Sequence, residues 1–246
     1  MNVSLVNAAA AMNANARWQE VISENLSASS VPGFRRQQMS FSAVEAGVIR
    51  NDPSLQHWSL PKATNTTSFQ RGELYRSDSP LHVGIEGPGF FEVQMPDGTM
   101  GYTRDGSFQM NAQGQLVTKL GYPVMGSNGP IQFDRNSPAP ISISPTGEVS
   151  QGGEGKGELK LVDFNQPQQL MPVTGGYFIT GTSGIMPEEL RTPAVRQGFL
   201  EGANTSSVAE MANLITAMRG FETNQRIVQL NDERMGRAIS ELGNPN

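Results

Sequence analysis

Histidine, the residue most often found at metal and acid–base sites, occurs only twice in this chain. His57 and His82 do not form an H-x-x-x-H pair, and the chain has no cysteine to complete a zinc site or a disulfide. An isolated histidine lacks the partners that a site requires, so both are expected to be surface or packing residues. The sequence therefore predicts no catalytic residue and no metal ligand.

Two glycine-rich stretches superficially resemble phosphate-binding loops. In GGEGKGEL, at 152–159, Gly157 stands after Lys156 where a hydroxyl residue belongs, and Ser150 occupies the place of the first glycine. In GIEGPGFF, at 84–91, the glycines have the wrong spacing for a dinucleotide fingerprint, and no helical pattern follows. No nucleotide or other cofactor is predicted.

A pair of carboxylates would suit an enzyme that cleaves cell-wall glycan. The candidate carboxylates are scattered on or near β turns, where solvated structural roles are usual, and nothing in their spacing places two of them in one cleft. They are Glu73, Glu86, Glu92, Asp97 and Asp105. A periplasmic wall-cleaving enzyme is kept only as a remote alternative.

Composition excludes other classes of function. The formal net charge of −5 argues against a nucleic-acid binder that works through a general positive field. No stretch approaches the roughly 20 apolar residues of a membrane span. The first residues lack a basic region and a continuous apolar run, so we expect a mature helix there and export without a cleaved signal peptide.

Apolar residues recur in steps of three and four near both ends of the chain, which predicts two long helices. The C-terminal helix is expected over 207–242. The predicted seam residues are Leu5, Met12, Ile22, Leu26, Met211, Leu214, Met218, Phe221, Val228, Met235, Ile239 and Leu242. Alanines in the first segment permit close approach, so the two helices are expected to pair as a coiled coil. Such a pair also suits repeated packing against copies of itself.

Between the helices the pattern changes to short apolar stretches separated by turns. The 27 glycines and 16 prolines favour many short strands, and no βαβ alternation is visible. The expected fold class is α+β: a mainly-β central domain of short antiparallel strands at 71–203, helical segments at 1–33 and 204–246, and an extended arm or linker at 34–70. Turns are expected at 96–98, 105–106 and 111–114, and further strands near 131–133, 141–144, 159–164, 177–179 and 196–200.

The first helix is stopped firmly by SENLSASSVPGFRRQ, at 23–37. The residue before Pro32 is biased out of helical geometry, and Gly33 permits a sharp change of direction. Phe34 could anchor the chain while Arg35 and Arg36 meet an acidic neighbour or a helix C-terminus; a solvated basic pair is the equal alternative. This stretch is hypothesised to be the joint between the helical and β-rich parts.

Three segments in order carry a family resemblance. ENLSASSVPGFRRQ resembles the N-terminal signature of bacterial flagellar rod and hook proteins, including Asn25, Leu26, Pro32, Gly33 and Phe34 as its turn motif. Residues 87–126 are similar to the family's central β signature, and residues 197–228 to its C-terminal signature. The chain is too short for the large inserted domain of a hook protein. Its motifs are closest to the proximal-rod member, with the distal-rod member as the alternative.

The resemblance implies a structural, non-enzymatic role in the basal body. The terminal helices would form the inner tube of the periplasmic rod, and the β domain an outer layer that contacts neighbouring subunits. Implied partners are copies of the chain, other rod subunits and the flagellar type III export apparatus. A secreted adhesin or scaffold would also explain helices and β turns, but it would not explain three ordered signatures.

Overall fold

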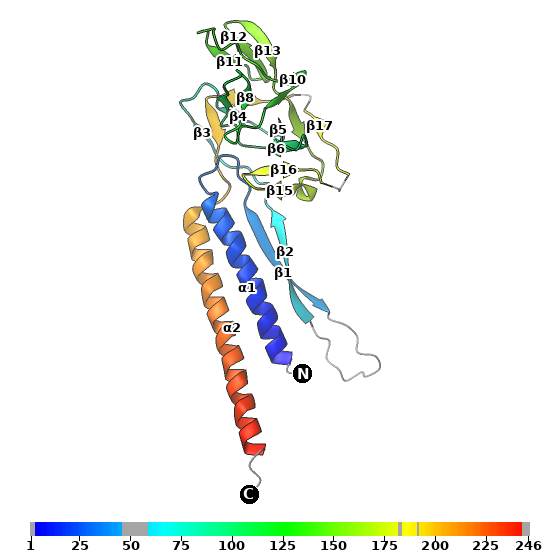
Figure 1. Cartoon of the computed structure of the whole chain (residues 1–246), viewed down its shortest axis with the longest axis vertical. Helices are drawn as coiled ribbons and strands as arrows, with labels where there is room; N and C mark the ends of the chain where they lie inside the picture. Colours follow the sequence, from blue (N-terminus) through cyan, green and yellow to red (C-terminus); the bar gives the residue numbers. More distant parts are fainter. Residues whose placement is uncertain (1–2, 46–58, 182–183, 191, 243–246) are drawn as a thin grey trace. The chain divides into compact units, whose positions relative to one another are not determined.

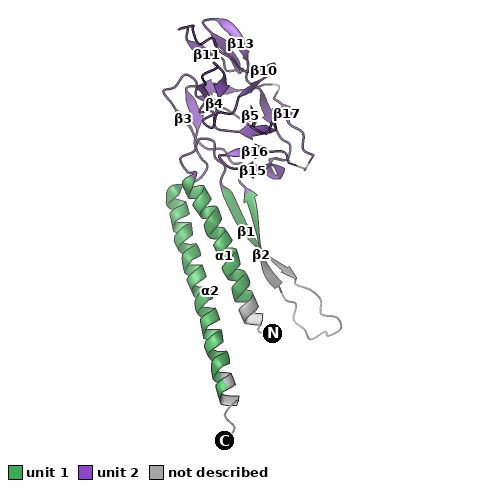
Figure 2. Cartoon of the chain, in the orientation of Figure 1, with its two compact units in different colours: residues 1–27, 37–66, 206–246 green, residues 28–36, 67–205 purple. Residues whose placement is uncertain are grey.

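The computed structural model describes residues 3–45, 59–181, 184–190 and 192–242. The chain forms two compact units, coloured separately in Figure 2. Unit 1 comprises residues 1–27, 37–66 and 206–246, and unit 2 comprises residues 28–36 and 67–205. The chain therefore passes between the units after residues 27, 36, 66 and 205.

Two antiparallel helices form most of unit 1 (Figure 1): α1 (Val3–Ser27) and α2 (Ser207–Leu242). Small side chains bring them together, because Ala14 of α1 and Ala217 of α2 are both buried. At Gly220 of α2 an added Cβ would lie only 3.2 Å from the side-chain nitrogen of Asn15 on α1. The predicted pair of terminal helices is confirmed.

A two-stranded ribbon completes unit 1, formed by β1 (Gln37–Glu45) and β2 (Ser59–Thr67). Threonine hydroxyls of β2 donate to backbone carbonyls of β1, for example Thr64 Oγ1 to Ser40 O at 3.4 Å. The aromatic rings of Trp18 on α1 and Phe41 on β1 meet edge to face at 6.1 Å. No strands were predicted here: β1 does alternate apolar and polar residues, at Met39, Phe41 and Ala43, but β2 (SLPKATNTT) shows no such period.

Unit 2 is built from short strands. They are β3 (Leu74–Arg76), β4 (Val83–Ile85), β5 (Phe90–Gln94), β6 (Met100–Thr103), β7 (Gln109–Met110), β8 (Leu116–Val117), β9 (Met125–Gly126), β10 (Gly129–Pro130), β11 (Ile141–Ile143), β12 (Glu148–Gln151), β13 (Glu154–Glu158), β14 (Leu161–Asp163), β15 (Met171–Val173), β16 (Tyr177–Ile179), β17 (Glu188–Glu189), β18 (Val195–Gln197) and β19 (Phe199–Glu201). A single 3-10 turn, η1 (Pro167–Gln169), precedes β15.

The largest sheet of unit 2 has six strands in the order β15-β16-β6-β5-β14-β17. A three-stranded sheet, β11-β12-β13, and the pairs β18-β4, β19-β3, β10-β9 and β7-β8 complete the unit. All of these pairings are antiparallel. The mainly-β, antiparallel prediction is therefore confirmed.

The core of unit 2 consists of two apolar clusters. The larger includes Phe91, Phe108, Leu116 and Tyr177, and the smaller centres on Phe90 with its aromatic neighbours. Burial raises the pKa of Tyr177 to about 12. The described part of the chain contains no helix long and apolar enough for a membrane span.

Of the three predicted turns, those at 96–98 and 111–114 are present, whereas residues 105–106 lie outside any β turn. Gly98 has φ +82° and closes the β5–β6 hairpin as expected. Residues 131–133 do not form a strand: Gln132 makes one isolated bridge to Gln115, although its two neighbours are buried. The strand predicted at 196–200 is split, because Gly198 adopts φ +75° and sends β18 and β19 to different partners.

Candidate functional site

Residues 28–36 lie between α1 and β1 in sequence but pack within unit 2. The backbone N–H of Gly33 donates to the carbonyl oxygen of Glu201 at 2.7 Å, and that of Asn204 donates to the carbonyl of Phe34 at 3.2 Å. VPGFRR is therefore held against EGANT, the segment just before α2. We call Gly33, Phe34, Arg35, Arg104, Glu201 and Asn204 the anchor cluster.

Position 33 of the anchor cluster requires glycine, for two reasons. Its φ is +68°, a left-handed conformation that costs other residues energy. An added Cβ would lie 2.3 Å from the carbonyl carbon of Arg104 and 2.5 Å from the nitrogen of Asp105. Both neighbours are backbone atoms, so they cannot move aside as a flexible side chain can.

Two arginines share one carboxylate inside the anchor cluster. Nη1 of Arg35 lies 2.7 Å from Oε1 of Glu201, and Nη1 of Arg104 lies 3.1 Å from its Oε2. These three side chains are at most 4 % exposed. Burial lowers the pKa of Arg104 to about 10, Glu201 opposes that shift, and the positive charges of Arg35 and Arg71 add to it. Arg35 thus meets an acidic neighbour, as one of the two sequence hypotheses expected.

Asn204 joins three stretches of unit 2 through its side-chain amide. Its Oδ1 accepts from the backbone N–H of Arg36 at 2.6 Å. Its Nδ2 donates to the carbonyls of Ser68 at 2.8 Å and Gln70 at 2.7 Å. Ser68 also donates its own N–H to the carbonyl of Arg36 at 2.8 Å. The Asn204 amide therefore holds the chain close to three of the four points where it passes between the units, after residues 36, 66 and 205.

Replacing Asn204 by alanine is expected to cost about 1 to 3 kcal/mol, because three backbone groups each lose a hydrogen bond, although the Gln70 carbonyl keeps its bond from Arg35. Hydrogen exchange at the Arg36 amide should accelerate, since this N–H loses its acceptor. Asn204→Asp is the matched control: it keeps an acceptor for Arg36 but loses both donors, so the Arg36 amide should stay protected. Equal exchange at Arg36 in the alanine variant and the unchanged protein would contradict this role.

Asn25 plays the corresponding part in unit 1. It is 1 % exposed, and its amide makes two hydrogen bonds of 2.8 Å with Gln37, donating to the carbonyl and accepting from the N–H. The side chain thus imitates a paired strand and ties the end of α1 to the start of β1. Leu26 beside it is half-buried, and Pro32 is buried with the anchor cluster. The two hydrogen bonds with Gln37 explain why the predicted turn motif has an asparagine at position 25.

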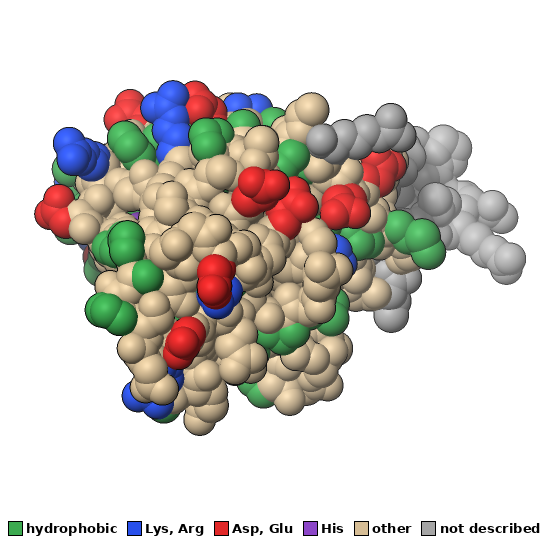
Figure 3. Space-filling view, turned by 90° about the horizontal axis from the view of Figure 1, so that it is seen from above, with side chains coloured by type: hydrophobic (Ala, Val, Ile, Leu, Met, Phe, Trp, Pro, Cys, Tyr) green, Lys and Arg blue, Asp and Glu red, His purple; other side chains and the backbone are tan. Residues whose placement is uncertain are grey.

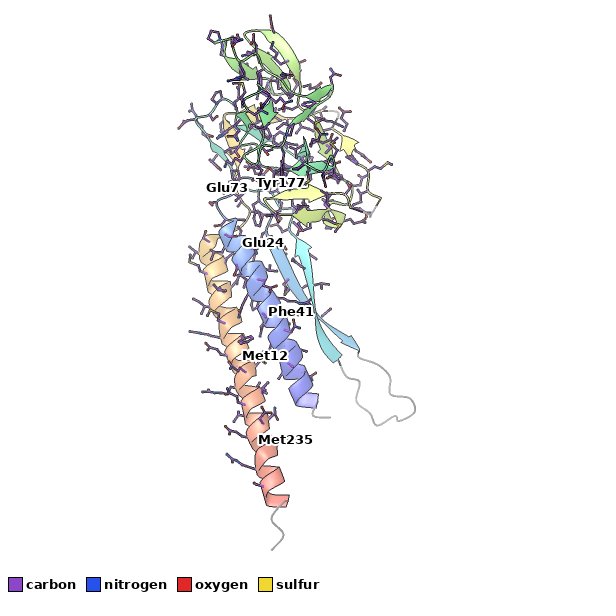
Figure 4. The ribbon with its side chains drawn as sticks, viewed as in Figure 1. Met12, Glu24, Phe41, Glu73, Tyr177 and Met235 are labelled. Carbon is purple, nitrogen blue, oxygen red and sulfur yellow. The ribbon has the colours of Figure 1, made fainter. Side chains whose placement is uncertain are left out.

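The predicted seam residues lie in different environments within the single chain. Ile22 is buried; Met12, Leu26, Leu214, Phe221 and Val228 are half-buried. Met211, Met218 and Met235 are each at least 50 % exposed, and Figure 4 labels Met12 and Met235 on the two helices. The side chains of Leu5, Ile239 and Leu242 lie outside those described. Ala217, outside the predicted seam, is fully buried. A role of the seam in assembly stays a prediction.

Most of the residues considered for chemistry have ordinary structural partners, although Asp105 lies close enough to His82 to act on its pKa. Glu86 forms a two-pronged surface ion pair with Arg196, and Glu92 pairs with Lys160 at 2.8 Å. His82 bonds to the hydroxyl of Ser77, and burial lowers its pKa; His57 is outside the described residues. The described residues contain no group of three or more potential metal ligands. On the face shown in Figure 3, acidic and basic side chains are interspersed among uncharged ones.

Arg104, Glu201 and Asn204 were not predicted as site residues. Their one visible signal was a charge or amide inside an otherwise strand-like stretch, as in GYTRD and GFLEG. Such a residue is tolerated in the interior only with a partner, but sequence spacing does not say which partner.

Known proteins resemble this chain from end to end. The family model described as "Flagellar hook protein FlgE/F/G D1 domain" matches residues 84–151, and "Flagellar basal body rod FlgEFG protein C-terminal" matches residues 196–241. The first match lies in unit 2; the second runs from β18 into α2 and includes Glu201 and Asn204 of the anchor cluster.

Individual relatives divide between two rod proteins. The flagellar basal-body rod protein FlgG of Buchnera aphidicola (subsp. Schizaphis graminum) is 33% identical, over 90% of this chain and 92% of its own. FlgF of Escherichia coli K12 is 31% identical over 97% of both chains, and FlgF of Mesorhizobium japonicum is 29% identical over 99% of both. The chain therefore belongs to the FlgE/F/G family of flagellar basal-body rod proteins, a structural and non-enzymatic family.

Proposed function

We propose that this chain is a proximal-rod subunit, which assembles with copies of itself and with other rod subunits into the periplasmic drive shaft that transmits motor torque. It is exported by the flagellar type III apparatus. Near-complete alignment with two FlgF proteins supports the proximal assignment, together with the motifs SVPGFR, GYPVMG and GFLEGAN.

One surface carries the assembly part of the proposal. Val208, Met211, Ile215 and Met218 follow helical spacing on the first turns of α2, and we call them the α2 stripe. They are 79 %, 52 %, 54 % and 50 % exposed, whereas Ala217 on the other side of the helix is fully buried. An apolar stripe of this kind is stabilised when a neighbouring molecule covers it.

A distal-rod role is the second candidate. The 33% identity to a FlgG protein favours it, and YTRDGSFQMNAQGQLVT resembles the distal-rod member equally well. The two candidates differ in where the subunit would lie along the rod, so electron microscopy of basal bodies from a deletion strain separates them. Loss of the proximal rod supports the first candidate, and a rod lacking only its distal part supports the second.

The assembly test places Ile215→Asp in the deletion strain. We expect export of the variant but at least tenfold less of it in purified basal bodies, because a charge on the α2 stripe resists burial in a contact. Thr223→Asp, an exposed position on the polar part of α2, is the control and should be incorporated normally. Motile cells with intact rods after deletion of the gene would overturn the whole proposal.

A further inference from the structure

We propose that a hollow in unit 2, beside the anchor cluster, binds the carboxylate of an acidic side chain from a second copy of this chain. The hollow has a volume of about 160 Å³. Arg35, Arg71 and Arg104 line it together with Asp163 and the rings of Phe69 and Phe90. The inference rests on the proposed assembly of copies, and it concerns unit 2 rather than the helices.

The charges around the hollow leave a positive surplus. Three guanidinium groups line it, whereas the carboxylates are Asp163 in the wall and Glu201, which pairs with Arg35 and Arg104 but does not line the hollow. Arg71 is exposed, so its positive charge is open to solvent, whereas Arg35 and Arg104 are buried. A single negative charge entering the hollow would balance the set.

Hydrogen bonding points in the same direction. Nη1 of Arg35 donates to the Gln70 carbonyl at 3.0 Å, and Nη2 of Arg104 donates to the Gly87 carbonyl at 2.7 Å. The Nε groups of both arginines are buried without a hydrogen-bond partner in the described structure. The cluster therefore has more buried donors than acceptors. A carboxylate, with two oxygens and about four acceptor positions, corrects that imbalance.

The walls favour a carboxylate on a short hydrocarbon stem over a phosphate. Phe69 and Phe90 offer apolar surface, and the guanidinium of Arg104 already stacks over the Phe90 ring at 5.4 Å. Asp163 would repel a doubly charged anion more strongly than a singly charged one. Glutamate and aspartate side chains have the required charge and stem.

A second copy is a ready source of that carboxylate. The chain has 23 acidic residues against 18 basic ones, so its copies present a surplus of acidic side chains. A contact between this hollow and a different patch on the next copy is heterologous, the kind of contact that builds open helical assemblies.

Binding is tested on the isolated full chain with sodium acetate as the probe and sodium chloride at equal ionic strength as the control. We expect saturable shifts of the Nε–H NMR signals of the three arginines, and an affinity about tenfold lower in Arg71→Gln because one charged donor is lost. Arg196, whose partner is Glu86, is the internal control and should not shift. Equal shifts with chloride, tighter binding of inorganic phosphate, or unchanged affinity in Arg71→Gln would each overturn the proposal.

Rod assembly distinguishes a neighbouring side chain from a free carboxylate. Arg71→Glu should reduce incorporation into basal bodies severalfold, Arg71→Lys should largely preserve it, and Lys119→Glu, an equal charge change outside the hollow, should leave it unchanged. Normal incorporation of Arg71→Glu beside failure of Ile215→Asp would overturn this inference and leave the proposed function standing.

The neighbour that contacts the hollow can be identified by cross-linking. Because the chain has no cysteine, a single introduced cysteine can be labelled specifically. Arg71→Cys carrying a photoreactive label should cross-link in assembled rods to another copy of this chain, identified by mass spectrometry. Cross-links solely to a different rod protein would overturn the choice of a second copy.

Discussion

Replacing Gly33 by alanine is expected to lower the free energy of unfolding of unit 2 by about 2 to 5 kcal/mol. One part of the cost is the left-handed conformation, which alanine adopts with strain. The larger part is the contact of the new methyl group with the backbone of Arg104 and Asp105, which requires residues 33–36 or the 104–105 backbone to shift. The hydrogen bond from Gly33 to Glu201 would be strained by the same shift.

Urea unfolding followed by circular dichroism measures this loss, and Gly98→Ala is the matched control. Gly98 has a similar φ of +82°, but no atom lies within 4 Å of the position that a Cβ would take there. Its substitution should therefore cost only about 1 kcal/mol, the strain of the backbone alone. If the two variants lose equal stability, the close approach at Gly33 contributes nothing and our account of the turn is wrong.

Replacing Glu201 by glutamine is expected to be the most damaging single change in the anchor cluster, at about 3 to 5 kcal/mol. The variant is nearly isosteric, so little packing is lost. Instead, two guanidinium groups that are at most 4 % exposed lose their shared negative charge. Hydrogen exchange of the Gly33 and Gly72 amides, which both donate to Glu201, should report the loosening locally.

Glu86→Gln tests whether burial is the reason for the large loss of stability expected in Glu201→Gln. Glu86 also pairs with an arginine through two short contacts, but both partners are about half exposed. Water and salt replace a surface pair at small cost, so less than about 1 kcal/mol should be lost. A Glu201→Gln protein as stable as Glu86→Gln would show that the buried arginines do not depend on this carboxylate.

The sequence predicted features that depend on local rules. Both terminal helices were found because their apolar residues keep the helical period over many turns, and the bounds of α2 agree with the predicted 207–242. The turn at Gly98 was predicted because a tight turn between two strands needs a positive φ, which glycine adopts readily. A change of chain direction at Gly33 was predicted from its place after Pro32, but its close approach to the backbone of Arg104 and Asp105 was not.

Features that depend on distant partners could not be predicted. Glu201 meets Arg35 and Arg104 across 166 and 97 positions of sequence, and nothing in the spacing of charges links them. The β1–β2 ribbon escaped detection because β2 has no hydrophobic period, so nothing in the sequence marked it as the partner of β1. The seam was predicted as one stripe, whereas the structure divides α2 between a face of small residues toward α1 and the exposed α2 stripe.

The four passages of the chain between its units have a mechanical consequence. A protein whose two parts share one linker transmits a twisting load through a single backbone, and one cut separates the parts. Here the backbone crosses between unit 1 and unit 2 four times, so a load on either unit is divided among four connections. A single protease nick at any one passage would leave both units covalently joined.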